Sequence, residues 1–224
     1  MKVRYLGHSA LQIVAGGTEF VFDPFISGNP RAGVTLAELD PDYLLITHAH
    51  GDHWGDTPEL AKRSGAVVIA TAEIAKYAER LGLESHAMNI GGSMKFGFGR
   101  VTLTPAWHSS SFPDGSYGGM PTGILLEVEG KRVLHAGDTA LFSDMSLIGR
   151  EPIDLAFLPI GDNFTMGPAA AVEAVKLLKP KVVVPVHYDT FPLIAQDAQA
   201  FKLAVEEATS SSCVVLAPGE EAAF

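Results

Sequence analysis

The segment Tyr43–Trp54, YLLITHAHGDHW, constrains the fold of this chain more than any other part of its sequence. A short apolar run, Tyr43–Ile46, ends abruptly, and a cluster of three histidines and one aspartate follows it: His48, His50, Asp52 and His53. Such a run favours a buried strand, so we expect the cluster in a loop at the C-terminal end of that strand. Neutral imidazoles and carboxylates are side chains that bind first-row transition metals. The segment therefore predicts a metal site at the edge of a sheet.

Similar strand-like runs elsewhere in the chain also end in histidine or aspartate. They place His8 after Val3–Gly7, His108 after Val101–Trp107, Asp138 after Arg132–Gly137 and His187 after Val182–Val186. One histidine at the end of a strand means little. Several of them indicate that one edge of the sheets forms a metal-binding rim.

The composition indicates a folded protein with an acidic surface. The chain has 224 residues, of which 47% are hydrophobic and 19% charged, so it can bury a substantial core. The formal net charge of −10 and the absence of a lysine or arginine cluster disfavour nucleic-acid binding. An anionic substrate stays compatible with this charge, because bound metal ions would dominate the local field. The lone Cys213 excludes an intrachain disulfide and is expected to be a small core residue.

Neither targeting nor membrane insertion is indicated by the sequence. The N-terminal apolar pattern is broken by Gly7 and His8, unlike that of a signal peptide, and no apolar run approaches the length of a membrane span. We therefore expect a cytoplasmic protein whose partner is a small-molecule substrate, without nucleic acid or membrane.

Strands and helices alternate in each half of the chain. Strands are predicted at Lys2–Leu6, Leu11–Ala15, Glu19–Phe22, Tyr43–Ile46, Ala66–Ala70, Ser93–Phe96, Arg100–Trp107, Thr122–Val128, Arg132–His135, Asp154–Pro159, Lys181–Val186 and Cys213–Leu216. Helices are predicted at Thr57–Ser64, Ala72–Leu81, Leu141–Ile148, Pro168–Leu178 and Ile194–Glu207. Turn sequences at Gly16-Gly17-Thr18 and Glu129-Gly130-Lys131 indicate hairpins. The pattern predicts two sheets packed face to face with helices outside, a four-layer αββα sandwich that forms one domain over residues 1–224.

Three loops are expected to determine which substrate binds: Ile26–Gly33, Ser109–Gly119 and Asp162–Gly167. The loop Ser109–Gly119 is long, rich in glycine and serine and adjacent to His108, which suits a lid over a site. An idle surface loop explains the same composition, and the sequence leaves these two alternatives open.

The residues Thr47–His53, THAHGDH, match the T-H-x-H-x-D-H signature of the metallo-β-lactamase superfamily, which the chain resembles over essentially its whole length. Three later ligand positions match in the same order, at His108, Asp138 and His187. Within the superfamily the chain is similar to small metal-dependent hydrolases of the L-ascorbate-6-phosphate lactonase type. The similarity lies in Tyr5–Ala10, Phe22–Phe25, Ala106–Ser110, His135–Thr139 and Asp162–Gly167. The resemblance implies an αββα sandwich of the metallo-β-lactamase type, a site between the two sheets and hydrolysis as the activity.

The resemblance also implies two divalent metal ions, with zinc and manganese as the expected metals. The first ion would bind His48, His50 and His108, the second would bind Asp52, His53 and His187, and Asp138 would bridge them. Two cations that share one water lower its pKa and generate a hydroxide nucleophile near neutral pH. Asp52 would orient this hydroxide and accept its proton, which makes it a candidate catalytic residue.

Several further side chains each have two interpretations. His8 is a candidate catalytic proton donor or hydrogen-bond partner of the ligands, although a purely structural histidine fits the sequence equally. His135 is expected to be structural or to hold a ligand in place, and His86 to be an ordinary surface or packing residue. The pair Asp162-Asn163 would line the pocket or form a simple turn. Asp23 would brace the site by hydrogen bonds or only shape the turn that it begins.

The leading functional hypothesis is a dinuclear metal-dependent hydrolase that uses a metal-bridging hydroxide on a small ester, lactone or phosphorylated metabolite. An iron-dependent oxidoreductase of the same superfamily is an alternative, because the ligands alone do not exclude iron. The remaining alternatives to the leading hypothesis are a phosphodiesterase and a non-catalytic metal-binding module. β-Lactam hydrolysis is not expected, because the antibiotic-hydrolysing relatives lack an aspartate at the position of Asp138. The resemblance also suggests self-association into a homo-oligomer.

Overall fold

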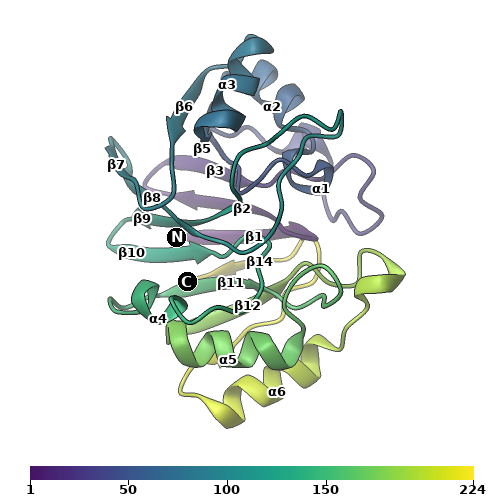
Figure 1. Ribbon diagram of the computed structural model, residues 1–224, viewed down its shortest axis with the longest axis vertical. Coiled ribbons are helices and arrows are strands. Elements are labelled where there is room, and N and C mark those ends of the chain that lie inside the picture. The colour runs from purple at the N-terminus through teal and green to yellow at the C-terminus, as the bar shows by residue number, and fades with distance from the viewer.

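Two seven-stranded mixed sheets pack face to face at the centre of the protein (Figure 1), as described by a computed structural model of residues 1–224. Helices α2 (Thr57–Ser64) and α3 (Ala72–Arg80) lie outside one sheet. Helices α5 (Pro168–Leu178) and α6 (Ala198–Ala208) lie outside the other. This arrangement confirms the predicted four-layer αββα sandwich.

The first sheet has the strand order β14-β1-β2-β3-β4-β5-β6. Its strands are β1 (Lys2–Gly7), β2 (Ala10–Ala15), β3 (Thr18–Phe22), β4 (Tyr43–Leu45), β5 (Val67–Thr71), β6 (Ser85–Met88) and β14 (Glu221–Ala223). Ala15 lies opposite Thr18 between antiparallel β2 and β3, which confirms the first predicted hairpin. The strands from β3 to β6 run parallel, so their C-terminal ends share one edge. The sequence pattern does not indicate β6 or β14.

The second sheet has the order β13-β12-β11-β10-β9-β8-β7. Its strands are β7 (Ser93–Phe96), β8 (Gly99–Pro105), β9 (Thr122–Val128), β10 (Lys131–His135), β11 (Leu155–Pro159), β12 (Val182–Val186) and β13 (Ser212–Cys213). The second predicted hairpin is confirmed, because Lys131 lies opposite Val128. The strands β10 to β13 run parallel and end at a common edge.

The remaining helical elements are short. They are α1 (Gly51–Trp54), α4 (Met145–Ile148) and the 3₁₀ turns η1 (Leu36–Glu38) and η2 (Pro192–Ile194). None of the helices has the length and apolar character that crossing a membrane requires.

Successive residues of β4 face different layers of the sandwich. Leu45 belongs to the core between the sheets, together with Phe157 of the second sheet. Leu44 belongs to the outer core, together with Leu60 and Ile74 of the covering helices. Because side chains alternate along a strand, a strand covered on both faces needs apolar residues at consecutive positions. This explains the unbroken apolar run that leads into the metal cluster.

Two predicted helices begin later than the sequence pattern suggests. The helix predicted at Leu141–Ile148 begins only at Met145, because the chain after β10 first turns back, and the N–H of Ala140 donates to the carbonyl of Trp107. The helix predicted at Ile194–Glu207 begins at Ala198. There the side chain of Asp197 accepts hydrogen bonds from two backbone N–H groups of the first turn, which is a typical N-cap.

The last predicted strand, Cys213–Leu216, ends at Cys213. The N–H of Val214 still donates to the carbonyl of Val183, but the chain then crosses to the first sheet, where β14 pairs with β1. Leu216 consequently packs in the core between the sheets. Cys213 is buried, as expected for a core residue.

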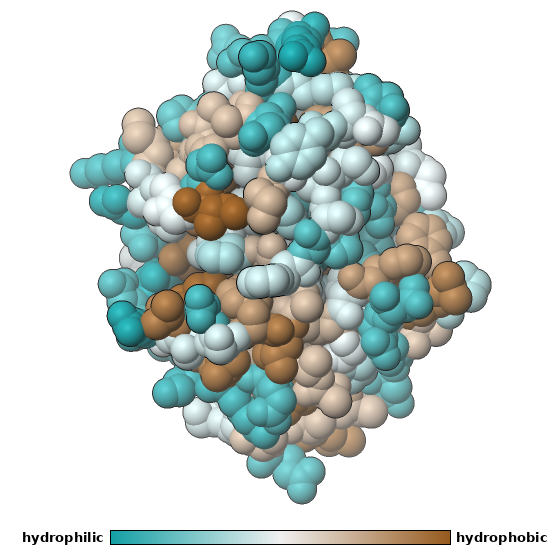
Figure 2. Space-filling view, in the orientation of Figure 1, coloured by the Kyte–Doolittle hydropathy of each residue, from teal (hydrophilic) through white to brown (hydrophobic).

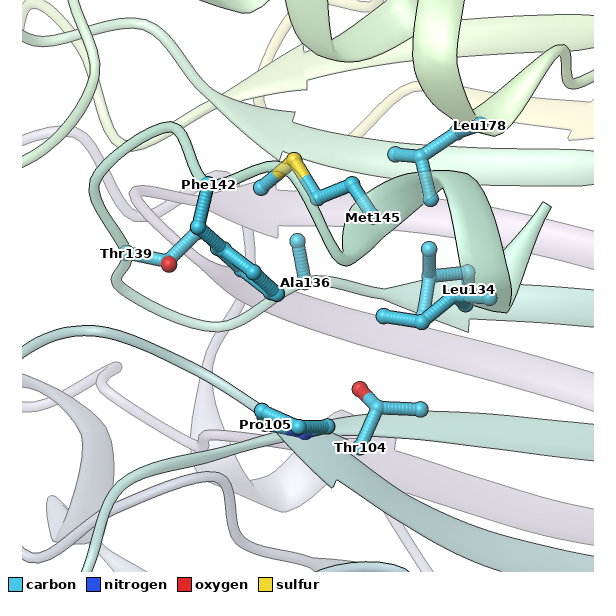
Figure 3. Close-up of a pocket in the computed structure, with 9 residues that line it drawn as sticks. Thr104, Pro105, Leu134, Ala136, Thr139, Phe142, Met145 and Leu178 are labelled. Atoms are coloured by element: carbon cyan, nitrogen blue, oxygen red, sulfur yellow. The ribbon is translucent and has the colours of Figure 1, made fainter.

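A small apolar cavity lies beneath α4 (Figure 3), between side chains of β8, β10 and the loop that follows β10. Its volume of about 10 Å³ is close to that of one water-sized sphere. The side chains of Leu134, Phe142, Met145 and Leu178 surround it. None of the predicted metal ligands lines this cavity, so it is a feature of the core and not the reaction site.

The substitution Met145→Ala is expected to enlarge this cavity and to lower the free energy of unfolding by about 2–5 kcal/mol. Met145 is 2% exposed, whereas Met94 on β7 is 43% exposed and provides a matched control. Urea unfolding of both variants measures the difference. Equal stability of Met145→Ala and Met94→Ala would contradict the packing described for α4.

Candidate metal centre

Four strand ends bring the predicted metal ligands to one place. His48 and His50 follow β4, His108 follows β8, Asp138 follows β10 and His187 follows β12. Asp52 and His53 lie in α1 and not in a loop, contrary to the sequence prediction. The helical turn closes directly after the strand end, because the carbonyl of His50 accepts the N–H of Trp54 at 2.8 Å.

The first group of ligand atoms consists of three imidazoles, those of His48, His50 and His108. One nitrogen from each ring lies within 4.8 Å of the other two. His48 Nε2 and His50 Nδ1 are 3.0 Å apart. The other ring nitrogen of His50 faces the hydroxyl of Ser109 at 3.4 Å. Three converging imidazoles can hold one transition-metal ion.

The second group consists of Asp52, His53 and His187, and the structure adds His8 to it. One atom from each of these four side chains lies within 4.8 Å of the others. Three of the side chains are buried, and that of Asp52 is 31% exposed. The second group therefore opens toward solvent on the side of its carboxylate.

Asp138 lies between the two groups. Its Oδ2 atom is 3.0 Å from Nε2 of His187 and 3.3 Å from Nε2 of His53 in the second group. The same oxygen is 3.6 Å from Nε2 of His108 and 4.0 Å from Nε2 of His48 in the first group. A carboxylate in this position is close enough to both groups to contribute a metal ligand to each of them.

Two buried atoms at the centre of the cluster have no hydrogen-bond partner. They are Nε2 of His53 and Oδ1 of Asp138, and the 3.3 Å contact of His53 with the other Asp138 oxygen lacks hydrogen-bond geometry. Leaving a buried polar atom unpaired costs free energy. Both atoms are of the kind that ligate zinc, manganese or iron, so the cluster fits a bound transition metal.

Asp23 determines how two of the imidazoles are oriented. Its carboxylate accepts hydrogen bonds from the backbone N–H of Thr47 (2.8 Å), the Thr47 hydroxyl (2.6 Å) and Nδ1–H of His53 (2.8 Å). Since the Thr47 hydroxyl donates to Asp23, its oxygen is left to accept from Nδ1–H of His48, at 3.0 Å. Both rings thus present Nε2 to the centre. Of the two interpretations of Asp23, the structure supports the brace.

His8 connects the second group to the loop after β12. Its Nε2 is 3.1 Å from Oδ2 of Asp52, and its Nδ1 is 2.8 Å from the hydroxyl of Thr190. A carboxylate can only accept, so Nε2 carries the hydrogen and Nδ1 accepts from the threonine hydroxyl. The carbonyl of His8 accepts from Tyr5 Oη and from the backbone N–H of His187, at 3.0 and 2.7 Å. These contacts hold the residue at a positive φ of 58°.

The environment sets the charge of each group. Burial lowers the pKa of His48, His50 and His108, so these rings are in the neutral form that binds metals. Burial also lowers the pKa of His8, to about 4, against the opposing effect of Asp52. His8 is therefore neutral at pH 7.

The pKa values at the centre shift in opposite directions. Burial alone would lower the pKa of His53, but the carboxylates of Asp138 and Asp23 outweigh it and raise this pKa well above the usual value. Burial would raise the pKa of Asp138, but His187 and His53 hold it well below its usual range. Asp138 is therefore ionised. A bound cation would take the place of the positive charge that these carboxylates favour on His53.

His135 has a structural role. Its Nε2–H donates to the carbonyl of Ser9 at 2.9 Å, and its Nδ1 accepts from the N–H of Gly137 at 3.0 Å. Its ring also stacks on Phe22, with 5.6 Å between the centroids. Both ring nitrogens are occupied, so none is left to bind a metal. His86 lies on β6, where its ring packs edge-on against Phe96.

The pair Asp162-Asn163 forms a turn outside the cluster. Both residues have positive φ angles, 61° and 50°, and the carboxylate of Asp162 accepts from the N–H of Asn163. The turn is attached to the loop after β10, because the N–H of Met166 donates to the carbonyl of Thr139 at 3.0 Å. The structure therefore supports the turn interpretation and places this pair beside the segment that carries Asp138.

The loop Ser109–Gly119 is packed against the body of the protein. The ring of Phe112 is 2% exposed and stacks on Tyr77 of α3, with centroids 3.7 Å apart. The hydroxyl of Ser110 accepts from the N–H of Ala49, between two of the histidines, at 3.2 Å. A Cβ atom at Gly118 would lie 2.3 Å from the Cβ of Ala49, so only glycine permits this approach. Ser110, Phe112 and Gly118 thus anchor the loop to the body of the protein beside Ala49.

The structure reveals three contacts that the sequence analysis did not identify. They involve the hydroxyl groups of Thr47, Ser109 and Thr190, each next to a histidine of the cluster. Thr47 and Ser109 adjoin metal-ligand motifs in the sequence, which is a signal that could have found them. Thr190 is 182 residues from His8 in the chain, and nothing in the sequence pairs the two.

Comparison with known proteins connects this geometry to a family. Residues 18–188 match the family described as the beta-lactamase superfamily domain. A UPF0173 metal-dependent hydrolase of Thermus thermophilus is 58% identical over 201 residues, which cover 90% of this chain and 89% of that protein. The chain belongs to the metallo-β-lactamase superfamily and, within it, to the UPF0173 metal-dependent hydrolase family. The similarity to L-ascorbate-6-phosphate lactonases stays a prediction.

Further relatives of this UPF0173 chain match it over nearly the whole length. A UPF0173 metal-dependent hydrolase of Pelotomaculum thermopropionicum is 50% identical over 225 residues, covering 98% of each chain. Among solved structures, Igni18, a metallo hydrolase of the archaeon Ignicoccus hospitalis, is 41% identical with a TM-score of 0.92. The match covers 100% of this chain and 97% of that one.

Proposed function

We propose that this UPF0173 chain is a dinuclear metal-dependent hydrolase. One ion would bind His48, His50 and His108, the second would bind Asp52, His53 and His187, and Asp138 would bridge the two. The observation that carries the proposal is the position of Asp138, whose Oδ2 lies within 4.0 Å of ring nitrogens from both groups. Divalent cations bound here, with zinc or manganese expected, would supply Lewis-acid activation of water and of the scissile carbonyl or phosphoryl group.

The chain's own residues would manage the proton of the attacking water. Asp52 is ionised, because the hydrogen bond from His8 and the charge of His53 outweigh burial and keep its pKa well below the usual range. Its partly exposed carboxylate can accept a proton on the open side of the second group. His8 would hold this carboxylate in place through Nε2–H, and Thr190 would fix the tautomer of His8 in turn. Hydrolysis of an ester then adds water across the acyl C–O bond and yields an acid and an alcohol.

The reaction class is hydrolysis of a small ester, lactone or phosphorylated metabolite. Purified protein loaded with zinc or manganese is expected to hydrolyse one of these classes, and His48→Ala is expected to abolish the activity. Unchanged hydrolysis by His48→Ala in metal-defined protein would overturn the proposal. A histidine and carboxylate set also binds iron. Protein that contains iron and consumes oxygen without hydrolysis would favour an oxidoreductase instead.

Thr190→Val is expected to lower kcat by about 10- to 100-fold while the metal content stays unchanged, because the hydroxyl acts on Asp52 only through His8. Thr190→Ser keeps the hydroxyl and is expected to retain most of the rate. Steady-state kinetics and metal analysis of the two variants test this role. A loss of rate in both variants to the same degree would show that Thr190 contributes only packing.

A further inference from the structure

An apolar wall stands beside the open side of the second metal group. It consists of Phe25 and Phe191. The ring centroids of Phe25 and Phe191 lie 5.6 and 5.8 Å from that of His8, and 6.5 Å from each other. His8 in turn contacts Asp52, so the wall adjoins the exposed carboxylate of the site.

The wall exposes much of its apolar surface. Phe191 is 38% exposed, and Leu193, two residues later in the same loop, is 68% exposed, although both are large apolar side chains. Figure 2 shows brown apolar side chains gathered at the right edge of the molecule, where the loop after β12 emerges in Figure 1. Apolar side chains exposed beside a reaction site can contact the apolar part of a ligand.

The loop that carries Phe191 is held in place by hydrogen bonds. The N–H of Asp189 donates to the carbonyl of Ile194 at 2.9 Å, and the N–H of Ile194 donates to the carbonyl of Phe191 at 3.0 Å. The side chain of Gln196 donates to the carbonyl of Gly161, which ties the loop to the end of β11. A surface fixed in this way loses little conformational entropy when it binds a ligand.

The wall itself offers no charged partner for a phosphate group. Phe25 and Phe191 present apolar rings beside His8. A phosphate group is usually held by arginine, lysine or a helix N-terminus. An uncharged group with an apolar chain fits the wall and needs no such partner.

We propose that the wall binds the apolar acyl chain of an uncharged ester or lactone, whose carbonyl then lies at the metal groups. The inference rests on the proposed hydrolase function and narrows its substrate class from the three named above. Each methylene that leaves water for an apolar surface contributes a factor of up to about four to binding. Longer acyl chains should therefore be better substrates until the wall is covered.

The experiment compares p-nitrophenyl acetate, butyrate and hexanoate with p-nitrophenyl phosphate on zinc- or manganese-loaded protein. The hexanoate-to-acetate ratio of kcat/KM is expected to be about 20 or more in the unmodified protein and to fall at least about fivefold in Phe191→Ala. Leu203→Ala, which removes a 68% exposed leucine on α6 that makes no contact with His8, is the matched control and should keep the ratio. Equal ratios in both variants, or a preference for the phosphate, would overturn the proposal.

Two further measurements distinguish ligand binding at the wall from hydrolytic activity and from self-association of the protein. If no ester is hydrolysed, calorimetric binding of hexanoate and acetate to the metal-loaded protein tests the wall alone. Tighter binding of hexanoate that is lost in Phe191→Ala would support the wall although the hydrolase function had failed, and equal affinities would overturn it. If Phe191→Ala changes only the mass measured by light scattering, the surface is a contact between copies and the proposal is wrong.

Discussion

The substitution Asp138→Asn is expected to reduce the bound metal from two ions per chain to one or none, and to lower kcat/KM by about 10³-fold. Asparagine preserves the size of the side chain but removes the negative charge that lies within reach of both imidazole groups. The loss of Lewis-acid activation is worth several kcal/mol, and each 1.36 kcal/mol corresponds to a factor of ten. Metal analysis by mass spectrometry and steady-state hydrolysis measure the two effects.

Asp162→Asn provides the matched control for this prediction. Asp162 follows β11 near the same edge, but it is exposed and belongs to none of the groups that could hold a metal. The control is expected to retain two ions and its activity. If Asp138→Asn also retained both ions and full activity, a bridging role of Asp138 would be excluded.

The substitution Asp23→Asn is expected to weaken metal binding by about 10- to 100-fold. The carboxylate of Asp23 accepts three hydrogen bonds and thereby sets the tautomers of His48 and His53. An amide offers one oxygen as acceptor and brings two N–H donors, so it cannot accept from all three groups. Competition with a chelator of known affinity measures the change. Because Asp23 is fully buried, the circular dichroism of the metal-free variant must be recorded in parallel.

Thr47→Ser and Thr47→Val separate the role of this hydrogen-bond chain from a general loss of stability. Serine retains the hydroxyl between Asp23 and His48, whereas valine removes it at nearly the same volume. We expect serine to bind metal as tightly as threonine does and valine to bind more weakly. Unaltered metal affinity in both Asp23→Asn and Thr47→Val would show that the imidazoles are held by packing alone.

The layered fold could be predicted from the sequence, because the pattern of apolar residues reports burial directly. The run Tyr43–Ile46 has apolar residues on both faces, as a strand covered by a sheet and by helices requires. The N-cap Asp197 stands directly before the helix start at Ala198, yet the apolar pattern placed the predicted start at Ile194, four residues too early. The crossing of the chain after Cys213 depends on pairing between distant strands, which local patterns do not encode.

The predicted ligands of the site could be found because their residue types and order are distinctive. The contacts of Thr190 and Phe191 with His8 could not, since they depend on how loops far apart in the chain meet. Thr190 reaches His8 across 182 residues, and Phe191 reaches the same ring only because the loop after β12 folds over it. The sequence left a lid and an idle surface loop open at Ser109–Gly119, and the packing that the structure shows there rests likewise on a distant contact, the stacking of Phe112 on Tyr77.

The most direct test of the dinuclear site is the number of ions that metal-free protein binds when titrated with zinc or manganese. We expect two ions per chain in the unmodified protein. His108→Ala and His187→Ala should each lose one, because their rings belong to different groups. Hydrolysis should require both ions. Saturation of the unmodified protein at one ion, or loss of the same ion in both variants, would contradict a two-metal centre.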